Sequence, residues 1–236
     1  MSLVQAPGTQ AQRLPATSTP TPTATAVVIT HGLRTIPHIA LTFDACPAVG
    51  FDKGIIHVLT ETQTPATFFL SGRWAQTHIS ATEYLASIPY FEIGEHSWSH
   101  PRFTAISIKR MDDEVSRTQT LLTSLTGHAP TLFRYPYGAY APRAVQEIYR
   151  LGLTPIQWDV VSGDPSKAMT ARLIERRVLS QTLNGSIIIM HVNGRGWHSA
   201  EALPTIIADL KAHGFQFVTV SDLLKPAPID VPRPAP

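Results

Sequence analysis

From about residue 39 onward, short apolar runs alternate with longer segments of helical periodicity. Repeated strand and helix units of this kind pack around a mostly parallel sheet, because each helix carries the chain back to the start of the next strand. The expected strands cover residues 39–44, 66–70, 91–95, 131–134, 153–158, 186–191 and 215–220. The pattern therefore predicts an α/β fold.

Three of the intervening helices have clear boundaries in the sequence. In residues 107–126 the apolar side chains recur at three- and four-residue steps, and Gly127 offers a stop. A second helix is expected over 142–152, where a proline suits the first turn, and a third over 200–213.

The two ends of the chain differ in composition from the middle. Of the 20 prolines, five lie in residues 1–37 and five in residues 226–236. The early stretch is rich in Ala, Pro and Thr and almost without charge, which suits an extended tether. We therefore predict an N-terminal arm over 1–37, a single folded domain over 38–225 and a proline-rich tail over 226–236.

Such an arm is typical of proteins exported to a periplasm, cell envelope or extracellular space, although a plain disordered terminus has the same composition. The basic-then-apolar pattern of a signal peptide is not present in this chain. Export is therefore an expectation drawn from the arm alone.

Charge and hydropathy argue against several classes of protein. Lysine plus arginine is 19 and aspartate plus glutamate is 17, a net charge of +2 with no long run of either sign. That balance argues against a nucleic-acid binder and against a basic membrane-surface protein. No stretch approaches the ~18 apolar residues that a membrane-spanning helix needs. The single cysteine, Cys46, excludes an internal disulfide and a zinc site built from several thiolates.

Polar side chains gather where the expected strands end. At or just past the carboxyl end of a strand lie Asp44, Glu95, His96, Arg134, Asp159 and His191. In a barrel of parallel strands this end forms the active face, built from the loops between strands and helices. We therefore expect these side chains to share one site.

Each of these residues allows a catalytic and a structural interpretation. His96 and His100, four residues apart, could present two imidazole nitrogens to one metal ion, or could be loop histidines bonded to backbone. Asp44 could be a general base tuned by burial and a nearby cation, or a cap of the following turn. Arg134 could bind a carboxylate through two hydrogen bonds or form a structural salt bridge. His191 could be a proton donor or a neutral buried histidine.

Taken in order, these segments resemble the polysaccharide deacetylases of carbohydrate esterase family 4, the NodB-like deacetylases, over about residues 39–224. The family's first motif, Thr-Phe-Asp-Asp, corresponds to Thr-Phe-Asp-Ala at 42–45. Its histidine pair, arginine motif, fourth motif and final histidine motif correspond to residues 92–101, 134–138, 158–165 and 189–191. The resemblance implies a distorted (β/α) barrel with seven parallel strands, one fewer than the regular form.

The resemblance also implies an activity, namely metal-dependent removal of acetyl groups from an N-acetylated polysaccharide such as peptidoglycan or a chitin-like chain. His96 and His100 would hold a divalent ion, for which zinc is expected, and Asp44 would be the general base, held in place by Arg134. The backbone amide of Tyr137 would help to stabilise the oxyanion.

The remaining roles implied by the resemblance concern the leaving group and the acetyl group. His191 would protonate the leaving amine, with Asp164 as the better candidate to support its charge and Asp159 as the second. Trp158 and Ile189 would form the apolar slot for the acetyl methyl group.

The chain departs from the family pattern at two positions. Ala45 stands where the family has the aspartate that is its third metal ligand. Asp52, Cys46 and Asp44 itself are the possible substitutes, and Asp52 is the one we expect. Pro165 replaces a usual tryptophan, which should reshape the substrate wall.

Three functions are compatible with this sequence. The leading one is an active deacetylase of N-acetylglucosamine polymers, because the proton-transfer residues are present. Ala45 alone favours the second, a catalytically silent relative that binds carbohydrate. The third is hydrolysis of another amide or acetyl ester, such as acetylated xylan, on the same scaffold.

Overall fold

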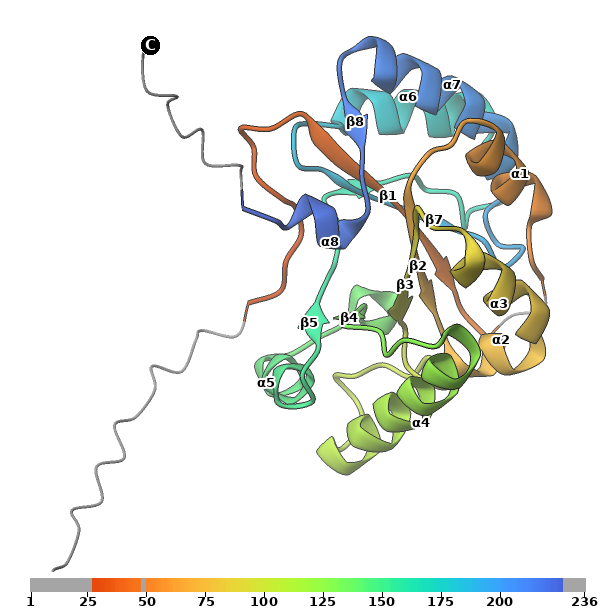
Figure 1. Ribbon diagram of the computed structural model, residues 1–236. Helices are drawn as coiled ribbons and strands as arrows, with labels where there is room; N and C mark the ends of the chain where they lie inside the picture. Colours follow the sequence, from red (N-terminus) through yellow and green to blue (C-terminus); the bar gives the residue numbers. More distant parts are fainter. Residues whose placement is uncertain (1–26, 48–49, 227–236) are drawn as a thin grey trace, which may run out of the picture.

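A computed structural model describes residues 27–47 and 50–226 of the chain (Figure 1). Residues 1–26 of the expected arm and 227–236 of the expected tail lie outside the described residues. The described end of the arm pairs with the folded domain: the Ile29 amide donates to Pro155 O at 3.0 Å, and the Gln157 amide donates to Ile29 O at 2.7 Å. Ile29, within the stretch expected as the arm, is therefore hydrogen-bonded to the folded domain.

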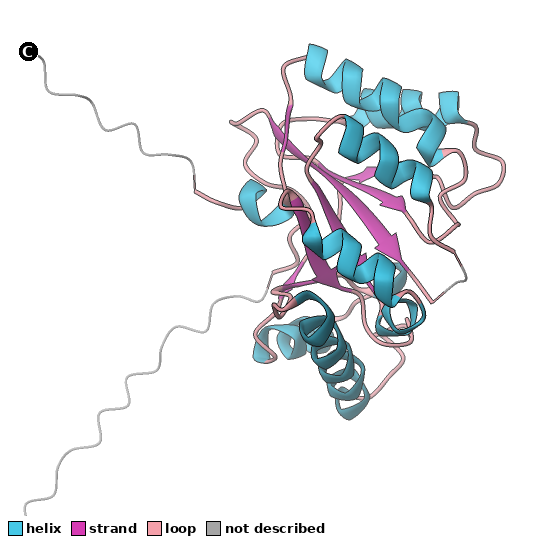
Figure 2. Cartoon of the chain, turned by 45° about the vertical axis from the view of Figure 1, so that its right-hand side comes forward, coloured by secondary structure: helices cyan, strands magenta, loops and turns pink. Residues whose placement is uncertain are grey.

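The strands form a single curved, parallel sheet. They are β1 (His38–Ala45), β2 (Ala66–Leu70), β3 (Phe91–Glu95), β4 (Leu132–Phe133), β5 (Thr154–Pro155), β6 (Val160–Val161), β7 (Ile187–His191) and β8 (Gln216–Phe217). Seven of them follow the order β5-β4-β3-β2-β1-β7-β6, and β8 pairs with the start of β1. The seven curl into an open half-barrel, which confirms the predicted fold class (Figure 2).

The helices flank this sheet (Figures 1 and 2). They are α1 (Lys53–Glu61), α2 (Gly72–Thr77), α3 (Ile79–Ser87), α4 (Ile108–Thr126), α5 (Pro142–Arg150), α6 (Ala171–Gln181), α7 (Ser199–Ala212) and α8 (Val220–Leu223). The three helices expected from the sequence are confirmed as α4, α5 and α7. Helix α4 begins after Ser107, whose hydroxyl accepts from the Arg110 amide, and ends at Gly127 with φ 79°.

The strands differ from those expected: β4 and β5 are shorter than the ranges 131–134 and 153–158. The strand expected over residues 215–220 is reduced to β8, because Thr219 caps helix α8 by accepting from the Asp222 amide. Strand β6 was not expected, since its two valines carry too short a pattern to recognise.

The core lies where the central strands are buried on both faces. Strand β2 is buried along its whole length, in keeping with a sequence that is apolar except for Thr67. The Phe68 ring stacks on Phe43 at 5.4 Å between centroids and contacts Phe91 at 5.0 Å, so one aromatic column joins β1, β2 and β3.

We expect Phe68→Ala to lower the free energy of unfolding by about 3–5 kcal/mol, because the substitution leaves a cavity inside this column. Urea denaturation would measure the change. Tyr84→Ala, at a side chain that is 50% exposed, is the matched control and should stay within about 0.5 kcal/mol. Equal losses in the two variants would contradict this account of the core.

Candidate active site

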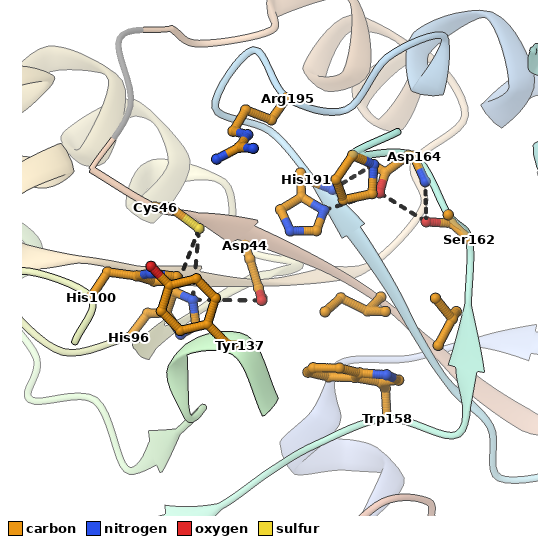
Figure 3. Close-up of a pocket in the computed structure, with 14 residues that line it drawn as sticks. Asp44, Cys46, His96, His100, Tyr137, Trp158, Ser162, Asp164, His191 and Arg195 are labelled. Carbon is orange, nitrogen blue, oxygen red and sulfur yellow. Dashed lines mark hydrogen bonds and ion pairs between the residues drawn. The ribbon is translucent and has the colours of Figure 1, made fainter. Parts of the chain in front are cut away.

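A pocket of about 300 Å³ opens at the carboxyl ends of the strands (Figure 3). Most of the residues that the sequence singled out line it: Asp44, His96, His100, Tyr137, Trp158, Asp164, Ile189 and His191. Figure 3 shows His96 and His100 on one side, His191 with Asp164 on the other, and Asp44 between them. Arg134 is not part of the pocket lining; it is fully buried and bonds to Asp44.

The register of the sheet brings the two proton-transfer candidates together. Strand β1 pairs in parallel with β7, and Asp44 lies directly opposite His191 in that pairing. His191 is the last residue of β7 and Asp44 is one residue from the end of β1, so their side chains meet at the same edge of the sheet. Strands β1 and β7 are separated by more than 140 residues of sequence, and only the topology makes them neighbours.

Asp44 is anchored by a buried ion pair with Arg134. The guanidinium donates from Nη1 to Asp44 Oδ1 and to Thr42 Oγ1, both at 2.8 Å, and from Nη2 to Gln157 O at 3.2 Å. Its positive carbon also lies 3.9 Å from the Phe69 ring centroid, a cation–π arrangement. These contacts fix the guanidinium, and through it the carboxylate.

The electrostatics keep Asp44 ionised. Burial alone would raise the pKa of its carboxyl group, but the charge of Arg134 outweighs burial and lowers that pKa. Arg134 bonds Oδ1, while Oδ2 lies 3.6 Å from His96 Nε2. Asp44 is therefore a carboxylate at neutral pH, able to accept a proton.

The two histidines are neutral, and His96 has a defined orientation. His96 Nδ1 donates to Arg134 O at 2.8 Å, which leaves the lone pair of Nε2 facing the pocket. Burial lowers the pKa of His96, and burial together with the neighbouring His96 lowers that of His100 to about 3. Neutral imidazoles are the form that binds metal ions.

Two buried glutamates hold the histidine loop in shape, a role that the sequence did not reveal. The Ser97 amide donates to Glu95 at 2.8 Å, and the Ser99 amide and hydroxyl donate to Glu114 at 2.6 and 2.7 Å. These bonds support a tight backbone in which Ser97 and His100 have φ values of 61° and 59°. In the sequence, Glu114 is an acid that falls at the helical spacing of the apolar residues of α4, and that pattern could have identified it.

A third donor lies next to the histidines. Cys46 Sγ is 3.2 Å from His100 Nε2 and 3.9 Å from His96 Nε2, and the three ligand atoms all lie within 4.8 Å of one another. One sulfur and two imidazole nitrogens suit a zinc ion. The donors present in the structure therefore fit the divalent ion that the family resemblance implies.

The structure does not bring Asp52, the third ligand expected from the sequence, to this cluster. Asp52 is the N-cap of α1, and its Oδ1 accepts from the amides of Gly54 at 2.9 Å and Ile55 at 3.3 Å. A helix start has free N–H groups that a carboxylate satisfies well. That local demand determines the position of the Asp52 side chain.

His191 is supported by Asp164 rather than by Asp159. Asp164 Oδ1 lies 3.0 Å from His191 Nδ1, and Asp164 Oδ2 accepts from the His191 amide at 2.7 Å and from Ser199 Oγ at 2.8 Å. Burial alone would lower the pKa of His191, but the hydrogen bond and charge of Asp164 outweigh it and raise that pKa. Asp159 instead pairs with Arg34 at 2.7 Å.

The other pocket walls are aromatic and apolar. Tyr137 lies in a short 3-10 turn with φ 59° and packs against His100, at 4.4 Å between ring centroids. Trp158, Ile189 and Pro165 also line the pocket. Arg195, which the sequence did not single out, also lines the pocket.

Residues 32–156 match the family model described as polysaccharide deacetylase. The chain belongs to this family, and the resemblance seen in its motifs is confirmed. The sequence is 32% identical over 190 residues to the peptidoglycan-N-acetylglucosamine deacetylase PgdA of Listeria monocytogenes, covering 80% of this chain and 39% of that protein. The chain thus spans about two fifths of the length of this relative.

Two further comparisons agree with the family. A peptidoglycan-N-acetylglucosamine deacetylase of Bacillus cereus is 31% identical over 190 residues, covering 79% of this chain and 68% of that protein. The solved structure of the Bc1960 peptidoglycan N-acetylglucosamine deacetylase, in complex with 4-naphthalen-1-yl-N-oxidanyl-benzamide, superposes with a TM-score of 0.78 at 29% identity. It covers 85% of this chain and 94% of that chain.

We expect Asp164→Asn to lower the pKa of the His191 imidazolium, because the opposing charge disappears while burial remains. The ring would then become neutral at a lower pH, which NMR titration of its side-chain signals would measure. In the wild type, the His191–Asp164 pair makes its full contribution to folding stability at pH values below about 6.5, the pKa of histidine in the unfolded chain. That contribution is lost as the pH rises through the raised pKa.

Asp159→Asn is the matched control, because it makes the same chemical change at a carboxylate that pairs with Arg34 instead. It should leave the His191 titration unchanged. A His191 pKa that is the same in wild type and Asp164→Asn would refute the role of Asp164.

Proposed function

We propose that this protein is a metal-dependent hydrolase that removes acetyl groups from N-acetylglucosamine units of peptidoglycan. The observation that supports it best is the pairing of Asp44 with His191 across β1 and β7. One is held as a carboxylate and the other has a raised pKa, which are the states that a general base and a general acid require. The relatives named as peptidoglycan deacetylases support the choice of substrate.

His96 and His100 would hold the divalent ion, with zinc as our choice, and the bound ion would polarise the acetamide carbonyl and acidify water. Asp44 takes the proton from the attacking water through the carboxylate that Arg134 keeps ionised and oriented. The backbone amide of Tyr137 contributes a hydrogen bond to the developing oxyanion.

His191 gives its proton to the amine as the carbon–nitrogen bond breaks, and Asp164 stabilises the imidazolium before that transfer. Trp158 and Ile189 bind the methyl of the acetyl group through the apolar wall that they form. Pro165 in this wall, where the family usually has tryptophan, leaves a smaller surface for the neighbouring sugar.

The proposed substrate implies a location. Peptidoglycan lies outside the cytoplasmic membrane, so the protein would act in the cell envelope or beyond it, as the composition of the N-terminal arm also indicates. Among the residues that the structure describes, no helix is long and apolar enough to cross a membrane.

Two other functions are each supported by a specific observation. Ala45 in place of a ligand aspartate favours a carbohydrate-binding relative that does no chemistry. The same pocket could also accept a different amide or an acetyl ester such as acetylated xylan. Product analysis separates these: acetate with a free amino sugar supports the deacetylase, and acetate without an amine supports esterase action.

The first experiment measures acetate release from peptidoglycan and from acetylated chitooligosaccharides, with added Zn²⁺ and with a chelator. We expect release from peptidoglycan that the chelator abolishes. Folded, zinc-loaded protein that releases no acetate from either polymer would favour the silent relative.

We expect Asp44→Asn to lower kcat by about 10²–10⁴-fold, the usual contribution of a general base. The amide keeps the shape of the side chain and an acceptor for Arg134, so circular dichroism should show a folded protein, with a lower free energy of unfolding because the buried Arg134 charge loses its partner. Asp159→Asn is the matched control and should retain wild-type kcat, because Asp159 lies outside the pocket lining. Full activity in Asp44→Asn would remove this residue from the base role.

A further inference from the structure

The Ala45 side chain cannot coordinate a metal ion, and the structure shows that it packs in the core instead. Ala45 is fully buried and belongs to the main hydrophobic cluster. Strand β1 continues through Ala45, which pairs with Leu70 of β2. Because side chains alternate between the two faces of a strand, Asp44 and Cys46 leave the end of β1 on the same side.

Cys46 is held in place by its backbone. Its carbonyl oxygen accepts from Asn193 Nδ2 at 3.1 Å, and Asn193 is itself fully buried on the loop after β7. The side chain is directed at the two histidines, with Sγ 3.2 Å from His100 Nε2 (Figure 3). The loops after β1 and β3 therefore converge on one point.

The Nε2 atoms of His96 and His100, which would bind the metal, face the Cys46 sulfur. The bond from His96 Nδ1 to the Arg134 carbonyl leaves Nε2 free for a metal, and a carbonyl behind a ligand histidine is the usual arrangement in zinc sites. Three protein donors complete the set that a catalytic zinc normally has, with the fourth position left for water or substrate.

We infer that Cys46 is the third protein ligand, so that this chain has a Cys-His-His metal site in which a thiolate replaces the family's carboxylate. The inference rests on the proposed function, because a metal ion is expected here only if the protein is a metal-dependent hydrolase. A bound thiol loses its proton, so it brings the same single negative charge as an aspartate. Sulfur also favours zinc and cobalt over magnesium and manganese.

The test uses the full chain, freed of metal with a chelator and titrated with Co²⁺. A cobalt–thiolate bond adds a strong charge-transfer absorption that nitrogen and oxygen ligands do not produce. Cys46 is the single cysteine of the chain, so any such band reports on this residue alone. We expect the band in the wild type, its loss on adding Zn²⁺ but not Mg²⁺, and its absence in Cys46→Ser and Cys46→Ala.

Isothermal titration calorimetry with Zn²⁺ gives the zinc affinity of the wild type and of each variant, including the variants without the band. In Cys46→Ala it should fall by about 100-fold or more, since changing only the groups that orient ligands already costs about 10–100-fold. Cys46→Asp should bind the metal without the band, because a carboxylate restores the charge. Asp52→Ala is the matched control: it removes the ligand expected from the sequence, which the structure places at the start of α1, and should keep both the band and the affinity.

A cobalt-bound wild type without the band would overturn the inference, as would a Cys46→Ala variant with wild-type zinc affinity. If the substitutions unfold the chain, the wild type alone decides the matter through iodoacetamide alkylation. Bound Zn²⁺ should slow the reaction of the Cys46 thiol, and an unchanged rate would also overturn the assignment.

The outcome is separable from that of the proposed function. A charge-transfer band in a protein that releases no acetate would support the Cys46 ligand and count against the deacetylase. Acetate release that depends on a metal, in a protein without the band, would support the deacetylase and count against Cys46.

Discussion

The buried ion pair between Arg134 and Asp44 is the interaction on which the rest of the site depends. Both groups are removed from water, which is costly unless each charge is matched and hydrogen-bonded. The two terminal nitrogens of Arg134 are hydrogen-bonded to Asp44, Thr42 and the Gln157 carbonyl. Its own carbonyl orients His96, so one residue positions both the base and a metal ligand.

The parallel sheet supplies the second constraint. Strands that run in one direction present their carboxyl ends together, and the register of β1 with β7 sets Asp44 opposite His191. The surrounding charges then separate the two groups chemically: Arg134 lowers the pKa of one and Asp164 raises that of the other. In the proposed mechanism, an acid and a base coexist near neutral pH for this reason.

The loops around the pocket are held by buried polar side chains rather than by apolar packing alone. Glu95 and Glu114 bind the histidine loop, while Ser162 and Ser199 bind Asp164. Burial raises the pKa of Glu95 well above its usual range. Such buried polar bonds favour a single loop geometry, because any other arrangement would leave the same groups without partners.

The sequence by itself determined the class of fold, the family and most of the pocket residues. Strands β2 and β3 have the expected bounds: β2 is a run of buried, mostly apolar residues, and β3 ends at Glu95, where the polar side chains of the histidine loop begin. Helix α4 was predictable from its periodicity and from Gly127. Asp44 and His191 were recognisable because the ends of parallel strands meet at one face.

Only the tertiary structure decided between neighbouring candidates. Asp52 and Cys46 lie close in sequence, yet one caps a helix and the other faces two histidines about 50 residues away. Asp164, not Asp159, supports His191, because Ser199 at the start of α7 and the His191 amide hold it there. Local patterns carry no information about such distances, since they arise from the packing of segments that are far apart in the chain.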